Sequence, residues 1–471
     1  MTFDRRWLLK SAAAATAAVA AGPLLTSQAS AAQPTAAAVP GVSLLDLFAS
    51  SDFNDEALFA LGGASSRTAE VGEVLRIANL INARTGNPAE PDTSAFDAYY
   101  EEFGRYGARL AASASAAADR HPVTAHNQYL RSAMYAAQQL FFVLGTRDGS
   151  REARVFDVAQ SRWMKAMRLL DPAIIASEVP SEFGPLPVYL LRTRVGSGPR
   201  PTVIISEGSD GQNVETMQFG VTAGLARGYN VVLFEGPGQM TPLFKRHVPF
   251  SPDWDKVVGP VLAWTRQQSD IGKVALIGIS FGGMLCARAA ARVDGLDAVV
   301  LEPGAYDFTT IWTDQENMAL VKETVNAKPA EKEGARRGLN EGFKEAWPSI
   351  PRPEQFSIYK RGSIFDRKVQ REARAGRAPS DYYGLLEKLL PFRFGADFRQ
   401  IRIPTLITAN EGDEFFGKQP DQAFELLTSV PRSQKALVHL TAQLGASLHD
   451  QPTGPQVAEE IVFDWLDDQL G

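Results

Sequence analysis

A serine flanked by glycines is the stretch of this sequence best suited to covalent chemistry. The pentapeptide Gly-Ile-Ser-Phe-Gly at residues 278–282 follows a run rich in valine and isoleucine and precedes an alanine-rich stretch. This order of strand, sharp turn and helix suits a nucleophilic Ser280, because the hydroxyl must stand clear of the sheet and only glycine leaves room for the flanking backbone. The N–H groups that begin the next helix would stabilise negative charge there. The alternative is a glycine-rich connection with a surface serine, and the elements predicted on both sides favour the nucleophile.

An acidic residue is needed downstream to orient the base that activates this serine. In the order typical of such sites, the acid follows the serine along the chain, on a loop after a strand. Asp413 meets this condition in the turn behind the apolar run at 403–408. Glu411 and Glu414 lie in the same turn and are the alternatives.

The base is predicted to be His449, which lies beyond the last apolar run, at 435–440. The chain has five histidines, so the choice is narrow. His439 falls inside the run and His247 far upstream, so neither has the required position. The order of serine, acid and histidine is therefore complete.

Two backbone donors are expected to stabilise an oxyanion beside the serine. One is the N–H of Phe281, directly after the nucleophile. The other is assigned to Ser209, in the turn after the run at 202–206. Asp210 is the next residue, and it is either a plain turn residue or N-cap, or a group that orients substrate or transfers a proton.

Alternating strands and helices from residue 173 onward would position these residues. Their spacing predicts an α/β fold with a mostly parallel, doubly wound sheet covered on both faces. One helix is expected at 212–227, between two of the strands. The predicted strands are 177–179, 188–192, 202–206, 230–234, 274–279, 298–301, 403–408 and 435–440.

The chain divides by pattern into six segments. Apolar residues at three- and four-residue spacing predict about five helices before the sheet, and a second helical, charged stretch interrupts it. The basic residues of that stretch, including Lys360, are interpreted as solvated helix faces rather than an anion site. The segments are a twin-arginine-type signal peptide (1–31), a linker (32–42), a helical N-terminal region (43–172), the first part of the core (173–305), a helical cap insertion (306–395) and the second part of the core (396–471).

The first residues resemble an export signal. Arg5 and Arg6 precede a weakly apolar alanine-rich stretch, and Ala29-Ser30-Ala31 offers a small-residue cleavage site. The pair Gly22-Pro23 interrupts that stretch, which makes an uncleaved membrane anchor the weaker alternative. We therefore expect export in folded form to the periplasm or the medium.

Composition narrows the class of protein. The 471 residues exceed one ordinary domain, and the net charge of −6 disfavours general binding to nucleic acid or anionic lipid. Cys286 is the only cysteine, which excludes an internal disulfide, and it is predicted to be a small buried side chain. Zinc-binding spacings, a P-loop and a complete dinucleotide fingerprint are missing, so no metal or cofactor is predicted. The expected partner is a small-molecule substrate, without nucleic acid and without stable membrane insertion after processing; a homodimer and a monomer both remain open.

Several motifs beyond the serine turn carry a resemblance to a known family. They lie at 121–131, 234–239, 249–254 and 445–451. With them the chain resembles the α/β-hydrolase superfamily, in particular the branch of 2,6-dihydroxypseudooxynicotine hydrolase and the fungal hydrolases that shorten polyketides in melanin synthesis. The resemblance covers roughly residues 100–470.

The resemblance implies an α/β-hydrolase core with a helical N-terminal region and a cap. It places the family's triad on Ser280, Asp413 and His449. Some members use an acidic residue in the turn after the third strand, where this chain has Asp210. The chain departs from the pattern elsewhere, for example with Asp450 where a cysteine is frequent.

The predicted function is that of an exported, cofactor-independent serine hydrolase. Its substrate would be a small organic molecule, cleaved either at an acyl (ester-type) bond or at the C–C bond of a β-diketone. Two alternatives remain: an exopeptidase-like hydrolase, and a non-catalytic exported binding protein on the same fold.

Overall fold

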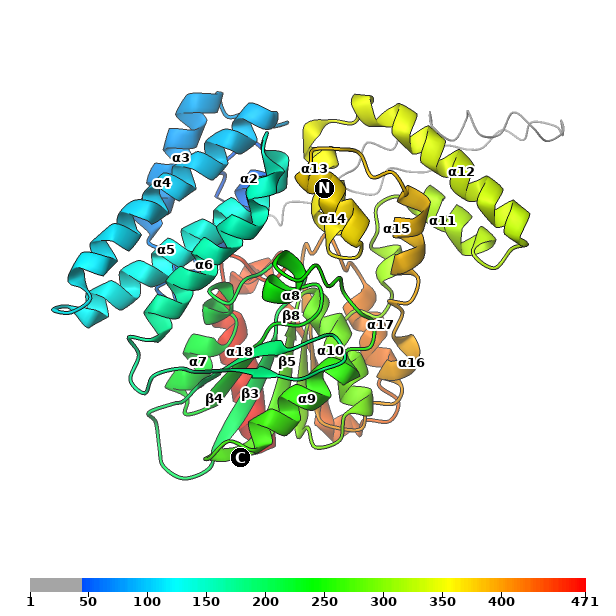
Figure 1. The fold of residues 1–471 in the computed structure, drawn as a ribbon. Helices are drawn as coiled ribbons and strands as arrows, with labels where there is room; N and C mark the ends of the chain where they lie inside the picture. Colours follow the sequence, from blue (N-terminus) through cyan, green and yellow to red (C-terminus); the bar gives the residue numbers. More distant parts are fainter. Residues whose placement is uncertain (1–44) are drawn as a thin grey trace.

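A single eight-stranded sheet forms the centre of the molecule (Figure 1). The computed structural model describes residues 45–471; the predicted signal peptide and linker lie outside these residues. The strand order is β1-β2-β4-β3-β5-β6-β7-β8, with β2 antiparallel to both of its neighbours and all other pairs parallel. The predicted fold class is thereby confirmed. The strands are β1 (Ile175–Val179), β2 (Leu186–Leu191), β3 (Arg200–Ser206), β4 (Asn230–Phe234), β5 (Ile271–Ile279), β6 (Ala298–Glu302), β7 (Thr405–Asn410) and β8 (Lys435–Leu440).

Helices cover both faces of this sheet, which explains why its inner strands are apolar throughout. Helices α7 and α18 pack together on one face, and α9 and α10 pack together on the other (Figure 1). The helices of the core are α7 (Val221–Ala226), α8 (Met240–Phe244), α9 (Asp255–Arg266), α10 (Phe281–Arg292), α17 (Gln419–Leu426) and α18 (Pro455–Leu470).

The prediction of one continuous helix at 212–227 is wrong. The structure has a 3₁₀ turn (Glu215–Gln218) and then α7, separated at Gly220. The φ of Gly220 is 109°, a left-handed conformation that ends helical geometry and that glycine adopts without steric cost. Its N–H donates to Glu459 of α18 at 2.9 Å, so contact with the neighbouring helix stabilises the break.

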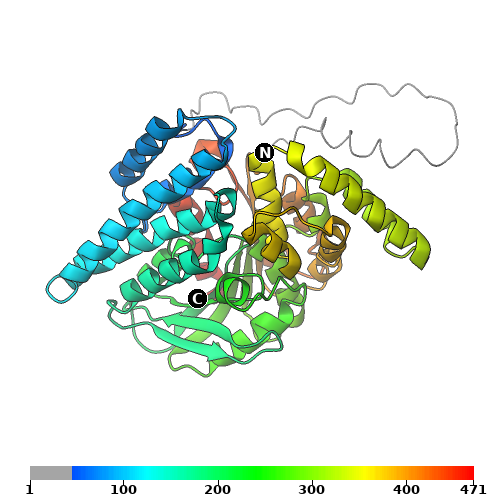
Figure 2. The same cartoon turned by 45° about the horizontal axis from the view of Figure 1, so that its top comes forward.

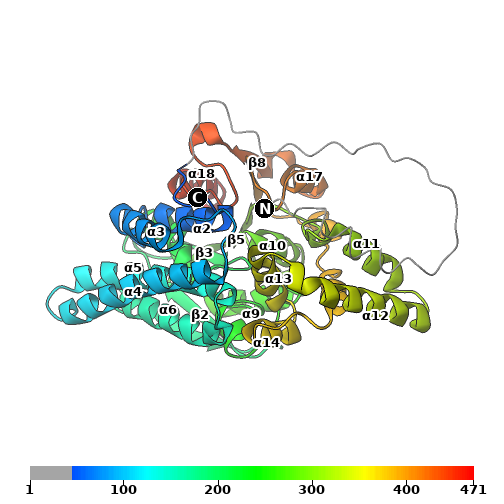
Figure 3. The ribbon, with the colours of Figure 1, turned by 90° about the horizontal axis from the view of Figure 1, so that it is seen from above.

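Two groups of helices lie side by side over the sheet, as the tilted and top views show (Figures 2 and 3). The first precedes the sheet in the sequence and consists of α2 (Ser51–Gly62), α3 (Val71–Thr85), α4 (Thr93–Ala117), α5 (Pro122–Phe142) and α6 (Glu152–Met167). We call it the helical region. The second, called the insertion, follows β6 and consists of α11 (Gln315–Thr324), α12 (Pro329–Ala346), α13 (Arg352–Ser363), α14 (Arg367–Arg374), α15 (Tyr382–Leu389) and α16 (Gly395–Phe398). Among residues 45–471, no helix is both long enough and apolar enough to cross a membrane.

Aromatic side chains form the core of the helical region. Helix α4 begins at Asp92, whose carboxylate accepts a hydrogen bond from the Ala95 N–H at 2.9 Å. Phe96, Tyr99 and Phe103 recur on one face of this helix at three- and four-residue spacing, and all three are fully buried. Their burial fixes α4 against α5, the most extensive helix pair among residues 45–471.

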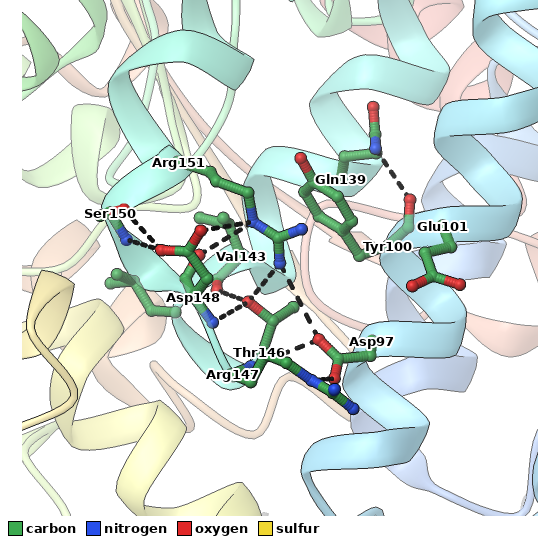
Figure 4. A network of polar contacts seen from close by, with 12 residues as sticks. Asp97, Tyr100, Glu101, Gln139, Val143, Thr146, Arg147, Asp148, Ser150 and Arg151 are labelled. Carbon is green, nitrogen blue, oxygen red and sulfur yellow. Dashed lines mark hydrogen bonds and ion pairs between the residues drawn. The ribbon is translucent and has the colours of Figure 1, made fainter.

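The turn between α5 and α6 is tied to α4 by a polar network (Figure 4). The guanidinium of Arg147 donates to Asp97 of α4 at 2.5 Å, and that of Arg151 donates to the Thr146 hydroxyl at 3.0 Å. Asp148 accepts from Ser150 within the same turn. The turn therefore presents its backbone carbonyls in a fixed arrangement toward the insertion.

Arg352, at the start of α13, binds these carbonyls. Its guanidinium donates to the carbonyls of Gly145, Leu144 and Thr146 at 3.0–3.1 Å. The ring of Phe356, one helical turn later, packs against Phe96 with ring centres 5.2 Å apart. The contact thus combines three charge-assisted hydrogen bonds with aromatic packing, and it fixes α13 against the helical region.

Loss of this contact is expected to loosen α13 without unfolding the core. We expect Arg352→Ala to leave three partly buried carbonyls without a donor, at a cost of about 1–3 kcal/mol. Amide hydrogen exchange in α13 should accelerate while exchange in β3 and β5 stays unchanged. Arg393→Ala is a control, because this more exposed arginine pairs with Asp307 within the insertion. Equal exchange in α13 of wild type and Arg352→Ala would contradict the role assigned to the contact.

Candidate active site

Three side chains that are far apart in the sequence form one hydrogen-bonded chain above the sheet. The Ser280 hydroxyl lies 2.9 Å from Nε2 of His449, and Nδ1 of His449 lies 3.0 Å from Oδ2 of Asp413. Ser280 follows β5, Asp413 follows β7 and His449 follows β8. Because these strands are parallel, their carboxyl ends meet at the same edge of the sheet, which brings the three residues together.

Ser280 occupies a strained turn between β5 and α10. Its φ of 54° and ψ of −124° are unusual for a residue with a side chain, and its N–H donates to the Glu302 carbonyl at 2.5 Å. Neighbouring backbone leaves no space for a side chain at the flanking glycines. A Cβ on Gly278 would lie 2.4 Å from the Gly282 carbonyl oxygen, and one on Gly282 would lie 2.6 Å from the Ser206 carbonyl oxygen. The turn is therefore built to hold the hydroxyl in one place.

Asp413 is the acid that contacts the imidazole. Its Oδ1 accepts hydrogen bonds from the Phe415 and Phe416 N–H groups at 2.8 and 3.0 Å, which leaves Oδ2 for His449. Burial raises the pKa of Asp413, but His449 and the two N–H groups outweigh this effect and bring the pKa below its ordinary value. Asp413 is therefore ionised at neutral pH. The alternative Glu411 instead accepts from the Ala442 N–H at 2.8 Å, away from the imidazole.

His449 lies in a largely buried and negatively charged position. Its side chain is 16% exposed and contacts the rings of Phe415 and Phe416. Burial by itself would lower the pKa of His449. The carboxyl groups of Asp450 and Asp413 together have the larger effect and raise the pKa to about 9. Its basicity thus depends on two acidic neighbours.

The turn after β3 lies directly against the serine. In the sheet Ser206 pairs with Gly278, so the ends of β3 and β5 are level. The Gly208 N–H is already used, because it donates to the Glu207 carboxylate at 2.5 Å. This favours Ser209 over Gly208 as the second oxyanion donor, alongside the N–H of Phe281 at the start of α10.

A side chain at Gly208 is expected to displace the serine. A Cβ there would lie 2.7 Å from Cβ and 3.2 Å from Oγ of Ser280, closer than these atoms tolerate. We expect Gly208→Ala to lower kcat/KM by about a hundredfold, because an error of about 1 Å in the reacting atoms has effects of this size. Thermal unfolding should change little by comparison. Gly72→Ala is the control, since a Cβ at Gly72 meets no atom within 4 Å; an unchanged kcat/KM in Gly208→Ala would contradict the proposed place of the nucleophile.

Asp210 and Lys360 form an ion pair between the core and the insertion. Their carboxylate and ammonium lie 3.3 Å apart, and the lysine side chain is 12% exposed. The interpretation of Lys360 as part of a solvated helix face is therefore wrong. Burial raises the pKa of Asp210, but Lys360 and the Ser209 hydroxyl outweigh it, so the pKa lies below its ordinary value.

A small cavity adjoins the ion pair of Asp210 and Lys360. A cavity of about 10 Å³ lies between the turn after β3 and α13, and Asp210, Lys360 and Ser363 are among its lining residues. This volume accommodates about one water molecule. A hollow of about 420 Å³ exists in the helical region, but its lining residues, such as Tyr100 and Arg154, do not include the serine, histidine or acid.

Three residues that belong to the candidate active site had no role assigned to them from the sequence. Lys360 is one. Gln239 is the second: its amide donates to the Gly208 carbonyl at 2.9 Å and so supports the oxyanion turn. Asp450 is the third, with its carboxyl 3.3 Å from Nε2 of His449. Gln239 and Asp450 both lie within motifs of the resemblance that could have pointed to them, whereas Lys360 does not.

The remaining groups considered for chemistry are Cys286 and possible metal ligands. Burial raises the pKa of the Cys286 thiol to about 12, which agrees with the predicted small buried side chain. Within residues 45–471, no group of three or more histidine, cysteine, aspartate or glutamate side chains is arranged to hold a metal ion.

Comparison with known proteins supports the expected resemblance. The model of the alpha/beta hydrolase family matches residues 211–454. The chain is 33% identical over 263 residues to the alpha/beta hydrolase psoB of Aspergillus fumigatus, and 30% identical over 259 residues to the 20-hydroxy-prefusarin hydrolase of Gibberella moniliformis. Each match covers 52% of the chain and only 56% and 58% of the two relatives.

Some relatives match along almost their whole length. The hydrolase acrC of Aspergillus aculeatus is 30% identical over 460 residues, which cover 91% of the chain and 98% of that protein. Among solved structures, 2,6-dihydroxy-pseudo-oxynicotine hydrolase superposes with a TM-score of 0.59 at 20% identity, covering 87% of the chain and 95% of that structure. The resemblance predicted from the motifs is confirmed.

Proposed function

Because the chain belongs to the alpha/beta hydrolase family, we propose that it hydrolyses a small organic substrate through a triad of Ser280, His449 and Asp413. The observation that carries this proposal is the continuous hydrogen-bonded chain from hydroxyl to imidazole to carboxylate, at 2.9 and 3.0 Å. The position of the hydroxyl on the strained turn before α10 supports it further. The bond cleaved is an acyl (ester-type) bond or the C–C bond of a β-diketone.

The proposed reaction begins when Nε2 of His449 accepts the Ser280 proton and Oγ attacks the substrate carbonyl carbon. The negative charge that forms on the carbonyl oxygen is stabilised by the N–H groups of Phe281 and Ser209, each worth about 3–4 kcal/mol in comparable sites. Collapse of the tetrahedral intermediate breaks the bond to the leaving group, which takes the proton from the imidazolium. Water, activated by the same imidazole, then releases the acyl group.

The ionisation state of Asp210 helps to decide between cleavage of an ester-type bond and cleavage of a C–C bond. A carboxyl group whose pKa lies below its ordinary value is ionised at neutral pH, so it is suited to accept a proton or a hydrogen bond rather than to donate a proton. In C–C cleavage, the diketone substrate has an acidic α-hydrogen and an enol hydroxyl that such a group could bind. An ordinary ester has neither. We therefore assign Asp210 to the orientation of a β-diketone substrate.

This assignment predicts a selective loss in Asp210→Asn. We expect kcat/KM for an aryl 1,3-diketone to fall about a hundredfold, within the range known for positioned acid–base groups. Hydrolysis of p-nitrophenyl acetate should change by less than about threefold, because Ser280 and its partners are untouched. Asp157→Asn is the control, since Asp157 forms an exposed ion pair with Lys245. Equal losses on both substrates would indicate damage to the site, and no loss on either would favour a simple esterase.

A substrate panel tests the proposed function itself. The mature protein would be assayed against p-nitrophenyl esters of increasing chain length, aryl 1,3-diketones and dipeptide amides. Turnover of esters or diketones supports the proposal. Turnover confined to dipeptide amides would replace it with an exopeptidase, and no turnover on any class would favour a non-catalytic binding protein.

We also propose that the protein is exported through a twin-arginine-type signal. The support is the pair Arg5-Arg6 before a weakly apolar stretch, followed by a small-residue cleavage site at 29–31. Expression in a bacterium with a twin-arginine pathway should yield exported protein that begins near Ala32. Arg5→Lys with Arg6→Lys should retain it in the cytoplasm, and exported protein that still begins at Met1 would contradict cleavage.

A further inference from the structure

A second carboxyl group contacts the imidazole on the side that exchanges protons with the serine. Oδ2 of Asp450 lies 3.3 Å from Nε2 of His449, and the same Nε2 lies 2.9 Å from the Ser280 hydroxyl. The side chains of Asp450 and His449 are 10% and 16% exposed, so solvent screens their interaction only weakly. The imidazole therefore stands between two acids: Asp413 at Nδ1 and Asp450 at Nε2.

The backbone around Asp450 is held in an unfavourable conformation. Leu448, Asp450 and Gln451 have φ values of 71°, 52° and 39°, a region that residues with side chains seldom adopt. The side-chain amide of Asn410 fixes the loop, donating to the Leu448 carbonyl at 2.9 Å and to the Gln451 side chain at 2.8 Å. Strain of this kind persists only where the surroundings enforce it, and here it places the Asp450 carboxyl at Nε2.

We propose that Asp450 is a positioning residue that holds a proton on Nε2 of His449 in the free enzyme and thereby sets the pH above which Ser280 is activated. The proposal rests on the proposed function, because it assumes that His449 is the base for Ser280. While Nε2 carries its proton and donates it toward Asp450, it cannot accept the serine proton. Loss of that one proton to solvent yields the neutral imidazole with its lone pair facing the hydroxyl.

The same contact acts again during the reaction. When Nε2 accepts the Ser280 proton, the imidazole becomes positively charged, and a carboxylate 3.3 Å away stabilises that charge. Asp450 therefore makes the imidazole a stronger base once it is deprotonated, at the cost of a higher pH for deprotonation. A substitution that removes the charge should reverse both effects.

Carboxyl groups surround this pair: Asp413 and Glu414 after β7, Asp210 and Glu207 after β3, and Glu302 at the end of β6. The basic groups on this side belong to α13, where Lys360 pairs with Asp210 and Arg361 lies over the ring of Phe415, which contacts His449. Burial raises the pKa of Asp450 to about 7, so its carboxyl is ionised above that pH. The carboxyl groups of Asp450 and Asp413 both raise the pKa of His449. Removing the negative charge of Asp450 therefore lowers that pKa.

The test is the pH dependence of Ser280 labelling by a fluorophosphonate probe, in wild type and Asp450→Asn. Asparagine has nearly the same shape and tolerates positive φ, so the loop should be retained. We expect the rising limb of the labelling rate to move down by about one pH unit or more, as loss of a close opposite charge implies. The plateau above the limb should fall by only about threefold, because catalytic efficiency falls less steeply than the basicity of the imidazole. The two profiles then cross: the variant reacts faster near pH 8, where Asp450 of wild type is ionised and His449 is still protonated, and more slowly near pH 10.

A merely structural role for Asp450 would lower the rate at every pH without moving the limb, and that result would overturn the proposal. Asp421→Asn is the matched control, because it removes an aspartate 3.0 Å from His439 in an exposed pair and should leave the profile unchanged. If Asp450→Asn does not fold, Asp450→Gly carries the same expectation, since glycine accepts the positive φ. Wild type that shows no Ser280-dependent labelling at any pH would refute the triad itself, whereas labelling with identical limbs in wild type and variant would refute only the role of Asp450.

Discussion

Replacement of Ser280 by alanine is expected to abolish turnover and fluorophosphonate labelling. The substitution removes only the hydroxyl group. The turn that carries it is fixed by backbone contacts on both sides, so the fold should be retained. Loss of a serine nucleophile typically lowers kcat by about 10⁶-fold and leaves only the rate supported by binding and the oxyanion donors. Substrate should still bind, with KM or Kd nearly unchanged. The measurement is kcat on the best ester or diketone of the panel, together with probe labelling followed by intact mass.

Ser269→Ala is the matched control for this experiment. Ser269 lies just before β5, at the opposite end of the strand that leads to Ser280, and its hydroxyl accepts a hydrogen bond from Arg192. Its replacement should leave labelling and turnover unaffected. Labelling that survives in Ser280→Ala would mean that another residue is the nucleophile.

Sequence alone predicted the sheet and the members of the triad because both depend on local patterns. Strands β3 to β7 are largely buried on both faces and appear as short apolar runs. Ser280 and Asp413 follow such runs, whereas His449 follows β8, which is only partly buried. Parallel strands then bring the loops after them to one edge, so Ser280, Asp413 and His449 could be expected to meet although 169 residues separate the first from the last. The choice between Asp413 and Glu411 depended on the geometry of one turn, which the sequence left open.

Contacts between distant segments could not be predicted in the same way. Lys360 belongs to a helix with several charged residues, and only the packing of α13 over the turn after β3 pairs it with Asp210. Asp450 adjoins the predicted base, but its contact with Nε2 depends on a loop in which three of the four residues 448–451 have positive φ, and no local pattern signals this. The break at Gly220 likewise depends on Glu459 from the last helix.

Replacement of Asp413 by asparagine is expected to be severely damaging, although less so than loss of the serine. Oδ1 of Asp413 accepts hydrogen bonds from the Phe415 and Phe416 N–H groups, so in the variant the amide oxygen must take that position. The NH₂ group then faces Nδ1 of His449 and donates to it. Nδ1 must become the acceptor and Nε2 must carry the proton, which is the wrong tautomer for accepting a proton from Ser280. We expect kcat to fall by about 10⁴-fold at neutral pH, as found where an orienting aspartate of such a triad becomes asparagine.

The comparison with Asp413→Ala separates the tautomer argument from simple loss of the acid. Alanine removes the orienting partner of His449 but imposes no tautomer, so Nε2 can still present its lone pair to the serine in a fraction of molecules. Asp413→Ala should therefore retain more activity than Asp413→Asn, although asparagine is closer to aspartate in shape. The order of the two is measured by kcat on one ester substrate at neutral pH. The reverse order would show that the Phe415 and Phe416 N–H groups do not fix the amide and that Asp413 acts mainly through its charge on the imidazole.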